Sequence, residues 1–257
     1  MRIIDVNSCI GCGKCVEDCV NGYIELVIDK NGNRIASFVE RGRCLECGHC
    51  NAICPQGAIS GGKVEIPDCS HDELLSLMTR KRTVRKYALG ERIQQDILDD
   101  IILAGQSAPT NRNRKSARII LIHEKLPYVY NKALDYLVEI VKKDGTINPL
   151  YIPTMRMNEK RDEVLWNAEY LVVFVGLSQN IVDAAIAAER MQLEAEKHGI
   201  GSAYRGDMVI GINNVEELKV ALGIRSNEEA LISFCLGKTK KKYSRPAVKT
   251  NRKVEHM

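Results

Sequence analysis

Eight of the ten cysteines follow one spacing twice, C-x2-C-x2-C-x3-C, first over residues 9–19 and again over residues 44–54. The N-terminal stretch MRIIDVNSCIGCG has no signal-peptide pattern, so we expect a cytoplasmic protein, in whose reducing surroundings disulfides are rare. A segment of this size cannot bury much apolar surface, so a group bound by the cysteines would also serve as its core. The spacing therefore indicates metal or redox chemistry in this part of the chain.

The cysteine runs predict two iron–sulfur clusters. Three thiolates at three-residue intervals can bind three irons of a cubane, and where two such clusters occur the fourth cysteine of each run ligates the other cluster. We therefore expect two [4Fe–4S] clusters, one bound by Cys9, Cys12, Cys15 and Cys54, and the other by Cys44, Cys47, Cys50 and Cys19. A zinc ion is the alternative, but one tetrahedral zinc would leave four of these thiols unused. Cys69 and Cys235 lie outside the pattern, and we expect Cys235, within LISFCLG, to be a core residue.

Hydrophobic periodicity divides the chain into two predicted domains. Residues 1–68 form a small ferredoxin-type domain, whose alternating stretch 24–39 predicts a hairpin with a tight turn at Asn31-Gly32. Residues 69–257 form a larger α+β domain that a capping-box pattern, Ser70-His71-Asp72-Glu73, opens with a helix. Its further expected helices cover 91–105, 127–143, 180–199 and 216–223, and its expected strands cover 117–124, 168–176 and 229–237.

Charge and hydropathy exclude two classes of function. The formal net charge is only +4, which is too mild for a dedicated nucleic-acid binder. The most apolar run, residues 170–177, is too short to span a bilayer and predicts a buried strand. We therefore expect neither a membrane nor a nucleic acid as partner.

The stretch RKRTVRKY, residues 80–87, is the densest basic run. By itself it is consistent with a solvated helix end, where cations suit the helix dipole. Three more segments follow it in order, and the set of four is Lys81-Arg82-Thr83-x-Arg85-x-Tyr87, then Ala108-Pro109-Thr110-x-x-Asn113, then Gly199-Ile200-Gly201-Ser202-Ala203-Tyr204-Arg205-Gly206, and last Leu236-Gly237 with Lys241, Lys242 and Arg245-Pro246. Taken together, these segments resemble the nitroreductase family of flavoproteins.

The resemblance implies FMN as cofactor, an α+β fold, and a homodimer whose two flavins lie at the subunit interface. It implies that the ribityl chain, phosphate and ring edge meet Lys81, Arg82, Thr83 and Arg85, while Arg80 and Lys86 face water. It implies that the same phosphate is closed off by Arg245 with Lys241 or Lys242. It further implies that the partner subunit supplies Pro109, Thr110 and Asn113, and that backbone near the flavin N5 comes from Tyr204, Arg205 and Gly206. The chain departs from the family pattern at Lys115-Ser116-Ala117, where Gln-Pro-Trp is common, so the resemblance does not say which residues wall the substrate pocket.

These features predict a flavin-dependent oxidoreductase. A low-potential donor, either a ferredoxin-like protein or NAD(P)H, would supply electrons that pass through the two clusters to FMN and on to a small oxidised substrate such as a nitro compound or quinone. No catalytic acid or base can be named from the sequence. The alternative is a non-enzymatic iron–sulfur redox sensor or electron carrier whose basic run binds nucleic acid.

Overall fold

The computed structural model describes residues 3–39, 44, 47–60, 72–144, 164–243, 245, 254–255 and 257. The chain divides into two compact units, which we call the cysteine unit (Met1–Lys81 with Lys242–Met257) and the sheet unit (Arg82–Lys241). The first of these compact units includes residues 69–81 and those after Lys241, whereas the domain boundary expected from the sequence lies after residue 68. Cys69 and most of the expected boundary segment lie outside the described residues.

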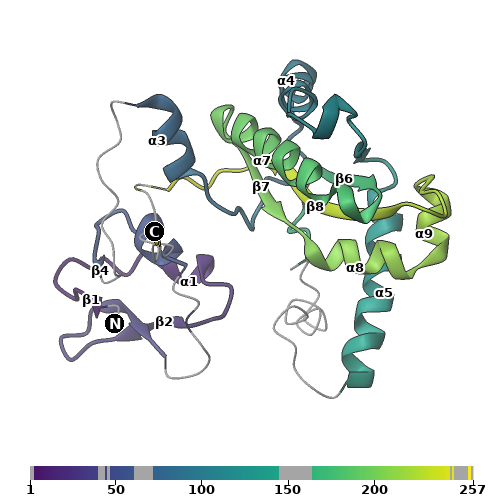
Figure 1. Ribbon diagram of the computed structural model, residues 1–257. Helices are drawn as coiled ribbons and strands as arrows, with labels where there is room; N and C mark the ends of the chain where they lie inside the picture. The colour runs from purple at the N-terminus through teal and green to yellow at the C-terminus, as the bar shows by residue number, and fades with distance from the viewer. Residues whose placement is uncertain are drawn as a thin grey trace. The chain divides into compact units, whose positions relative to one another are not determined.

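The cysteine unit is built from short elements (Figure 1). They are β1 (Ile3–Ile4), α1 (Lys14–Asp18), β2 (Ile24–Ile28), β3 (Arg34–Phe38), α2 (His49–Ile53), β4 (Ile59–Ser60) and α3 (Glu73–Arg80). Strand β1 pairs with β4 and β2 pairs with β3, both antiparallel. Helices α1 and α2 each begin directly after a left-handed glycine, Gly13 at φ 77° and Gly48 at φ 76°. The repeat in the sequence is therefore also a repeat in the backbone.

The predicted hairpin exists, but its turn is not the tight two-residue turn that we expected. Residues 29–33 connect β2 to β3, and within them only Gly32 has a positive φ, of 81°. The Asp29 carboxylate accepts hydrogen bonds from the backbone N–H groups of Asn33 at 2.7 Å and Asn31 at 2.8 Å. These bonds lower the pKa of Asp29 and give the loop an alternative to the tight turn.

The helix predicted to open at the capping box also begins later than expected. Its N-cap is Asp72, whose Oδ1 accepts a hydrogen bond from the Leu75 N–H at 2.9 Å. Aspartate is a strong N-cap residue, and this bond satisfies one of the amide groups that have no partner within the helix. Ser70, the residue expected to cap the helix, lies outside the described residues.

The sheet unit is an α+β fold around a four-stranded antiparallel sheet in the order β5-β6-β8-β7. The strands are β5 (Arg118–Ile122), β6 (Tyr170–Gly176), β7 (Ile200–Tyr204) and β8 (Glu229–Lys238). The helices are α4 (Gln95–Gln106), α5 (Leu126–Asp144), α7 (Ile181–Lys197), α8 (Gly206–Asn214) and α9 (Glu216–Ala221), with short 3-10 turns η1 (Asn111–Asn113) and η4 (Ser178–Asn180). None of the helices within the described residues has the length and apolar character needed to cross a membrane.

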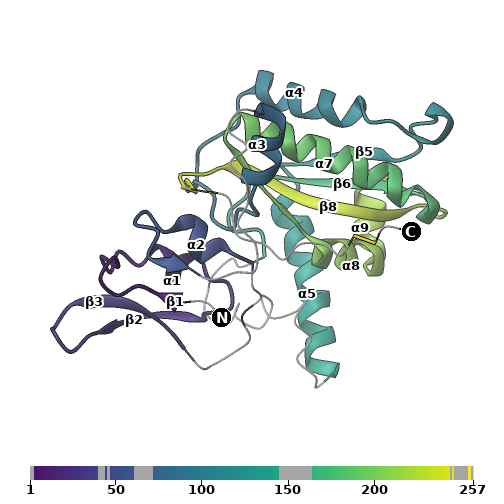
Figure 2. The same cartoon turned by 60° about the vertical axis from the view of Figure 1, so that its left-hand side comes forward.

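Strand β6 shows how the sheet separates two hydrophobic cores. Leu171, Val173 and Val175 point into the core on one face, whereas Val172 and Phe174 point into the core on the other. Helices α4 and α7 cover the second face, and α5, α8 and α9 cover the first (Figures 1 and 2). Because both faces are buried, the strand is a continuous apolar run rather than an alternating one.

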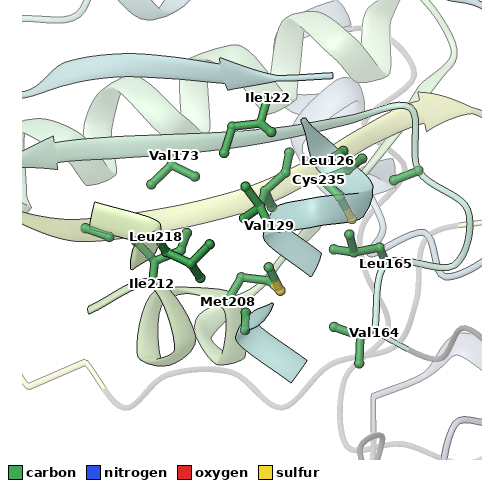
Figure 3. Packing of buried hydrophobic residues seen from close by; sticks show 14 of the residues in the cluster. Ile122, Leu126, Val129, Val164, Leu165, Val173, Met208, Ile212, Leu218 and Cys235 are labelled. Carbon is green, nitrogen blue, oxygen red and sulfur yellow. The ribbon is translucent and has the colours of Figure 1, made fainter. Parts of the chain in front are cut away.

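The core under α5, α8 and α9 joins residues from well-separated parts of the chain (Figure 3). Its labelled members are Ile122, Leu126, Val129, Val164, Leu165, Val173, Met208, Ile212, Leu218 and Cys235. Cys235 is fully buried, which confirms the core position expected from its apolar surroundings. Strand β7 and helix α8 were not expected, because small residues and glycines make both segments weak formers of regular structure.

Gly211 in α8 generates a prediction about the packing of this core. A Cβ atom at Gly211 would lie 2.5 Å from Cβ and 2.9 Å from Cα of Ala133 in α5. The obstacle includes backbone, so the helices would have to separate. We expect Gly211→Ala to lower the free energy of unfolding by about 1–3 kcal/mol, as overpacked cores do, measured by chemical denaturation.

The companion variants are Ala133→Gly and the double variant, which together form a mutant cycle. Since Ala133→Gly removes the nearest of the atoms that clash, the Ala133 Cβ at 2.5 Å, the double variant should be more stable than the sum of the two single effects predicts. Strict additivity of the two effects would contradict the close approach of α5 and α8.

Candidate functional site

The eight cysteines of the two runs gather around two separate cavities in the cysteine unit. One cavity is lined by loop residues 9–13 and by Cys15 and Cys54. The other is lined by residues that include Cys19, Cys44, Cys47 and Cys50. Each cavity thus takes three cysteines from one run and the fourth from the other, which is the crossed arrangement that the spacing predicts for two cubane clusters.

Backbone geometry around the first run favours a close fit to a bound group. Gly11 has φ 62°, and a Cβ atom there would lie 2.1 Å from the Arg34 carbonyl oxygen, so only glycine fits against β3. The Ala36 N–H donates to Cys9 Sγ at 3.4 Å, and the Tyr23 N–H donates to Cys19 Sγ at 3.2 Å. Such bonds to sulfur are among the features that tune iron–sulfur clusters.

The pKa of the buried Cys15 thiol reflects both its burial and the concentration of sulfur atoms around the first cavity. Burial, together with charge repulsion from the neighbouring Cys54 and Cys12, raises the pKa of Cys15 to about 11. Several thiolates would therefore repel one another here unless a cation offsets their charge. Iron binds cysteine as the thiolate and supplies that charge, so the donor set fits an iron–sulfur cluster.

Arg245 lies in the cysteine unit and has partners other than those that the sequence predicted. Its Nη1 donates hydrogen bonds to the carbonyl oxygens of Asn51 at 2.7 Å and Cys54 at 2.8 Å. Both acceptors lie within the second cysteine run. Arg245 thus contacts the cluster loop, and a bond from Arg245 to a flavin phosphate stays a prediction from the sequence. Lys242 also belongs to this unit, as does Lys81.

In the sheet unit, the basic run lies beside β7. Thr83 forms a parallel bridge with Ser202, and the Val84 N–H donates to the Ser202 carbonyl at 2.9 Å. A Cβ atom at Gly201 would lie 2.8 Å from the Val84 side chain, so glycine is needed for this approach. The structure therefore joins two of the four segments that carry the family resemblance.

Side chains of the run alternate between core and surface. Arg82 is 3% exposed and Val84 is also buried, whereas Thr83 and Arg85 are partly exposed. Arg80 and Lys86 are exposed, as expected. This alternation leaves the run without a continuous basic face, because its strand-like backbone points successive side chains in opposite directions.

The end of β8 brings further basic residues to the run. The Ala88 N–H donates to the Lys238 carbonyl at 2.8 Å, and Thr239 Oγ1 donates to the Lys86 carbonyl at 3.0 Å. Thr239 Oγ1 also accepts a hydrogen bond from the Lys241 N–H at 3.1 Å. Lys241 is therefore held next to the basic run, as the order of the segments implied.

Residues 204–206 connect β7 to α8, and the middle one is already engaged. The Arg205 N–H donates to the Ser233 carbonyl at 2.8 Å, and the Ser233 hydroxyl donates to the Arg205 carbonyl at 2.6 Å. The Arg205 guanidinium forms an ion pair with the buried Asp207 carboxylate. Burial raises the pKa of Asp207, and the positive charge of Arg205 counteracts part of this increase. The backbone contact to a flavin implied for Arg205 would have to displace a bond to β8, which leaves Tyr204 and Gly206 as the better-placed pair.

Sequence reasoning overlooked two polar features near β7. The Trp166 ring stacks against two guanidinium groups. The Arg205 Cζ lies 4.5 Å from the ring centroid, and the Arg85 Cζ lies 5.9 Å from it. Gln192, only 1% exposed in α7, accepts a hydrogen bond from the Ser202 hydroxyl at 3.0 Å. The sequence does contain a signal for the Gln192–Ser202 bond. Gln192 lies on the alanine-rich face of a predicted helix, and a buried polar side chain needs a hydrogen-bond partner.

The second of the four segments, Pro109 to Asn113, lies at the other edge of the sheet. It follows α4, and its Asn111 N–H donates to Asp183 Oδ1 at 3.4 Å. The Lys115 N–H donates to Thr110 Oγ1 at 3.0 Å, which closes the loop before β5. A cavity of about 560 Å³ lies here, lined by parts of α4, β5 and α7 together with Thr110 and Lys115.

This loop and the basic run are separated within one chain. They adjoin β5 and β7, the two opposite edges of the sheet. Asp183 lies in the first turn of α7, and β7 begins only after the end of this helix, which at 1.5 Å per residue is about 25 Å long. One small cofactor therefore does not contact both segments easily within a single protomer.

Comparison with known proteins gives two family matches. Residues 78–238 match the model of the nitroreductase family, and residues 8–59 match that of the 4Fe-4S dicluster domain. An uncharacterized ferredoxin of Methanocaldococcus jannaschii is 40% identical over 57 residues, covering 22% of this chain and 71% of that protein. One component of an ion-translocating oxidoreductase complex from Methanosarcina acetivorans is 39% identical over 52 residues, 20% of this chain but only 17% of that component.

Solved structures share the fold of the sheet unit. A nitroreductase with bound FMN from Desulfitobacterium hafniense aligns with a TM-score of 0.59 at 20% identity, covering 72% of this chain and 98% of that one. An FMN-dependent nitroreductase from Clostridium difficile aligns with a TM-score of 0.58 at 12% identity, covering 73% and 100%. The family match spans more than half of the chain, and it agrees with the fold and with the pairing of the basic run and β7. The chain therefore belongs to the nitroreductase family and carries a ferredoxin-type 4Fe-4S dicluster domain at its N-terminal end.

Proposed function

We propose that the protein is an FMN-dependent oxidoreductase that takes electrons from a low-potential donor through two [4Fe–4S] clusters and delivers them to a small oxidised substrate. The observation that carries the proposal is the junction of the basic run with β7 at Thr83, Val84 and Ser202. It gathers cations, a hydroxyl and a glycine-lined backbone at one edge of a nitroreductase-type sheet. The two four-cysteine cavities would hold the clusters, which transfer one electron at a time to the flavin.

The phosphate of FMN fits the donors at this edge. The ligands proposed at this edge are Arg82, Thr83 and Arg85 of the run, with Lys241 after β8, whereas Lys81 and Lys242 of the cysteine unit stay predictions from the sequence. A dianionic phosphate forms charge-assisted hydrogen bonds that are each worth about 1.5–3 kcal/mol. FMN, when bound, would supply exchange of either one or two electrons.

The residues around β7 would hold the rest of the cofactor and the substrate. Ser202 is fixed by Gln192, which keeps its strand in place against the basic run. The Tyr204 hydroxyl donates to Glu189 Oε2 at 3.3 Å, and burial raises its pKa, so Tyr204 stays neutral at physiological pH. A neutral, half-exposed aromatic ring beside Gly206 can pack against a planar group without adding charge.

A second copy of the chain would complete the site. Pro109, Thr110 and Asn113 lie at the sheet edge opposite the basic run, so a homodimer is the simplest way to bring both segments to one flavin. The 560 Å³ cavity beside this loop is lined in part by apolar residues, among them Ile102, Ala108 and Phe174. The expected cytoplasmic location, the donor and the substrate class stay predictions.

Burial argues against the alternative of a nucleic-acid-binding redox sensor. A basic patch for nucleic acid presents its cations on one accessible face, but Arg82 and the intervening Val84 are buried. Retention of nucleic acid that falls steeply with salt, in a preparation that contains no flavin, would restore that alternative.

The close approach of Gly201 to Val84 generates a prediction about flavin binding. Gly201→Ala places a methyl group against Val84 and pushes the basic run away from β7. We expect the dissociation constant for FMN to rise by about tenfold or more, equivalent to about 1.4 kcal/mol, measured by fluorescence titration of the apoflavoprotein.

Val84→Gly tests whether that loss arises from the contact itself. A Cβ atom at position 201 would lie 2.8 Å from Cβ of Val84 and 2.8–2.9 Å from its γ-carbons, so only glycine at position 84 makes room, and the Gly201→Ala, Val84→Gly double variant should bind FMN more tightly than Gly201→Ala alone. Unchanged FMN affinity in Gly201→Ala would exclude this edge as the flavin site.

The crossed cysteine sets predict matched losses of iron. Cys12→Ala and Cys47→Ala each remove a ligand of a different cluster, so the iron content should fall from about eight to about four atoms per chain in each variant. The FMN content should stay unchanged, because both changes lie in the cysteine unit.

The same two variants test the electron path under anaerobic conditions. Flavin reduction by a low-potential donor should slow strongly in Cys12→Ala, while direct reduction by NAD(P)H, if the wild-type protein shows it, should persist. Equal flavin reduction by the low-potential donor in wild type and both variants would show that the clusters do not feed the flavin.

A further inference from the structure

Arg245 caps the end of the helix that carries the second cysteine run. Helix α2 ends at Ile53, and the carbonyl groups of Asn51 and Cys54 accept hydrogen bonds from Arg245 Nη1 at 2.7 and 2.8 Å. Carbonyls at a helix C-terminus have no partner within the helix, and a cation there is favourable. One guanidinium therefore fixes the backbone of a residue that we assign as a cluster ligand.

The loop after that ligand is shaped to receive the guanidinium. Gly57 has φ 65°, and a Cβ atom there would lie 3.3 Å from Arg245 Nη2. The Gly57 N–H donates to the same Cys54 carbonyl at 3.3 Å, so this oxygen accepts from both sides. A larger residue at position 57 would crowd the arginine, which indicates that the loop and the guanidinium pack as one piece.

Tyr243 makes a second contact from the same segment, and it reaches both cysteine runs. Its ring meets the His49 ring edge-on, with centroids 5.6 Å apart, and its hydroxyl donates to Asp18 Oδ1 at 3.5 Å. Asp18 directly precedes Cys19, and His49 directly precedes Cys50. Tyr243 thus touches the residues next to one ligand from each run.

We propose that Tyr243 and Arg245 form a C-terminal clasp that holds the cluster loops in place and sets the reduction potential of the cluster that Cys54 ligates. The clasp completes a unit that begins at the other end of the chain, so the cluster-binding fold is not encoded by the N-terminal segment alone. This inference rests on the four-cysteine cavities and is independent of the flavin site.

The charge of Arg245 gives the expected direction of the effect on potential. A cluster held by four thiolates becomes more negative when it is reduced, and a nearby cation stabilises the reduced form. Removal of the cation should therefore shift the potential of this cluster to a more negative value. The second cluster, whose ligands are not bonded to Arg245, should change less.

The test uses the full-length holoprotein and three variants. Arg245→Gln removes the charge, and Arg245→Lys keeps it but cannot reproduce the two-acceptor geometry of a guanidinium. Lys240→Gln is the matched control, because it removes one positive charge from an exposed residue of the sheet unit that pairs with Glu91. For each variant we would measure iron and FMN content, cluster potentials by spectroscopic redox titration, and the rate of cluster loss to a chelator.

In Arg245→Gln, the ratio of reduced to oxidised cluster at a fixed potential should fall by about threefold to tenfold, the latter being 59 mV for a one-electron couple. Arg245→Lys should stay near the wild-type potential and yet lose its cluster faster, because the backbone of Cys54 is held less firmly. Lys240→Gln should match the wild type in both measurements. FMN content should be equal in all four proteins.

Two results would overturn the clasp. One is an Arg245→Gln protein whose cluster potentials and rate of cluster loss equal those of Lys240→Gln. The other is loss of FMN from Arg245→Gln with both clusters unaffected, which would return this arginine to the flavin phosphate. Should Arg245→Gln fail to retain clusters at all, the rate of cluster loss in Arg245→Lys and in Tyr243→Phe decides the question, and rates equal to the wild type reject the proposal.

Discussion

The approach of Val84 to Gly201 is the contact on which the sheet unit's candidate site depends. It joins the basic run to β7 through one backbone hydrogen bond and one missing Cβ atom. Without it, the arginines that flank Val84 would be ordinary surface charges at the end of a helix, and Ser202 would face an open sheet edge. Because a strand edge presents unpaired backbone groups, the run also protects β7 from pairing elsewhere. One glycine therefore decides whether the basic run can lie against β7.

A different constraint governs the cysteine unit, whose apolar core is small. Among the described residues, its buried hydrophobic cluster consists of Cys15, Ile24, Ala36, Ile53 and Ile59. A core of this size stabilises a fold only weakly, so iron–sulfur clusters would be structural as well as redox components. The raised pKa of Cys15 agrees with this view, because the folded thiols are crowded in a way that a bound cation relieves. Folding and electron transfer in this unit would then depend on the same atoms.

Much of this architecture could be predicted, because the features involved are local in the sequence. Regular cysteine spacing, long apolar periods and the buried run of β6 each appear within a short window. What escaped prediction depends on contacts between distant residues. The helix expected from residue 91 begins at Gln95, since the Ile93 N–H donates to Glu169 at 2.7 Å and holds the preceding chain extended. Strand β7 was missed because its edge position is defined by partners, not by its own small side chains.

Arg245 shows why charge and order along the chain do not suffice to assign a ligand. Placed after β8 and near other cations, it matched the end of a family pattern, and a shared phosphate was a consistent explanation. A guanidinium, however, binds backbone carbonyls at a helix end as well as it binds phosphate, because both offer closely spaced oxygen acceptors. Which one it meets depends on residues that are far away in the sequence, here Asn51 and Cys54. Arg82 and Arg245 carry the same guanidinium but lie in different surroundings, the first buried beside β7 and the second bonded to the carbonyls of Asn51 and Cys54.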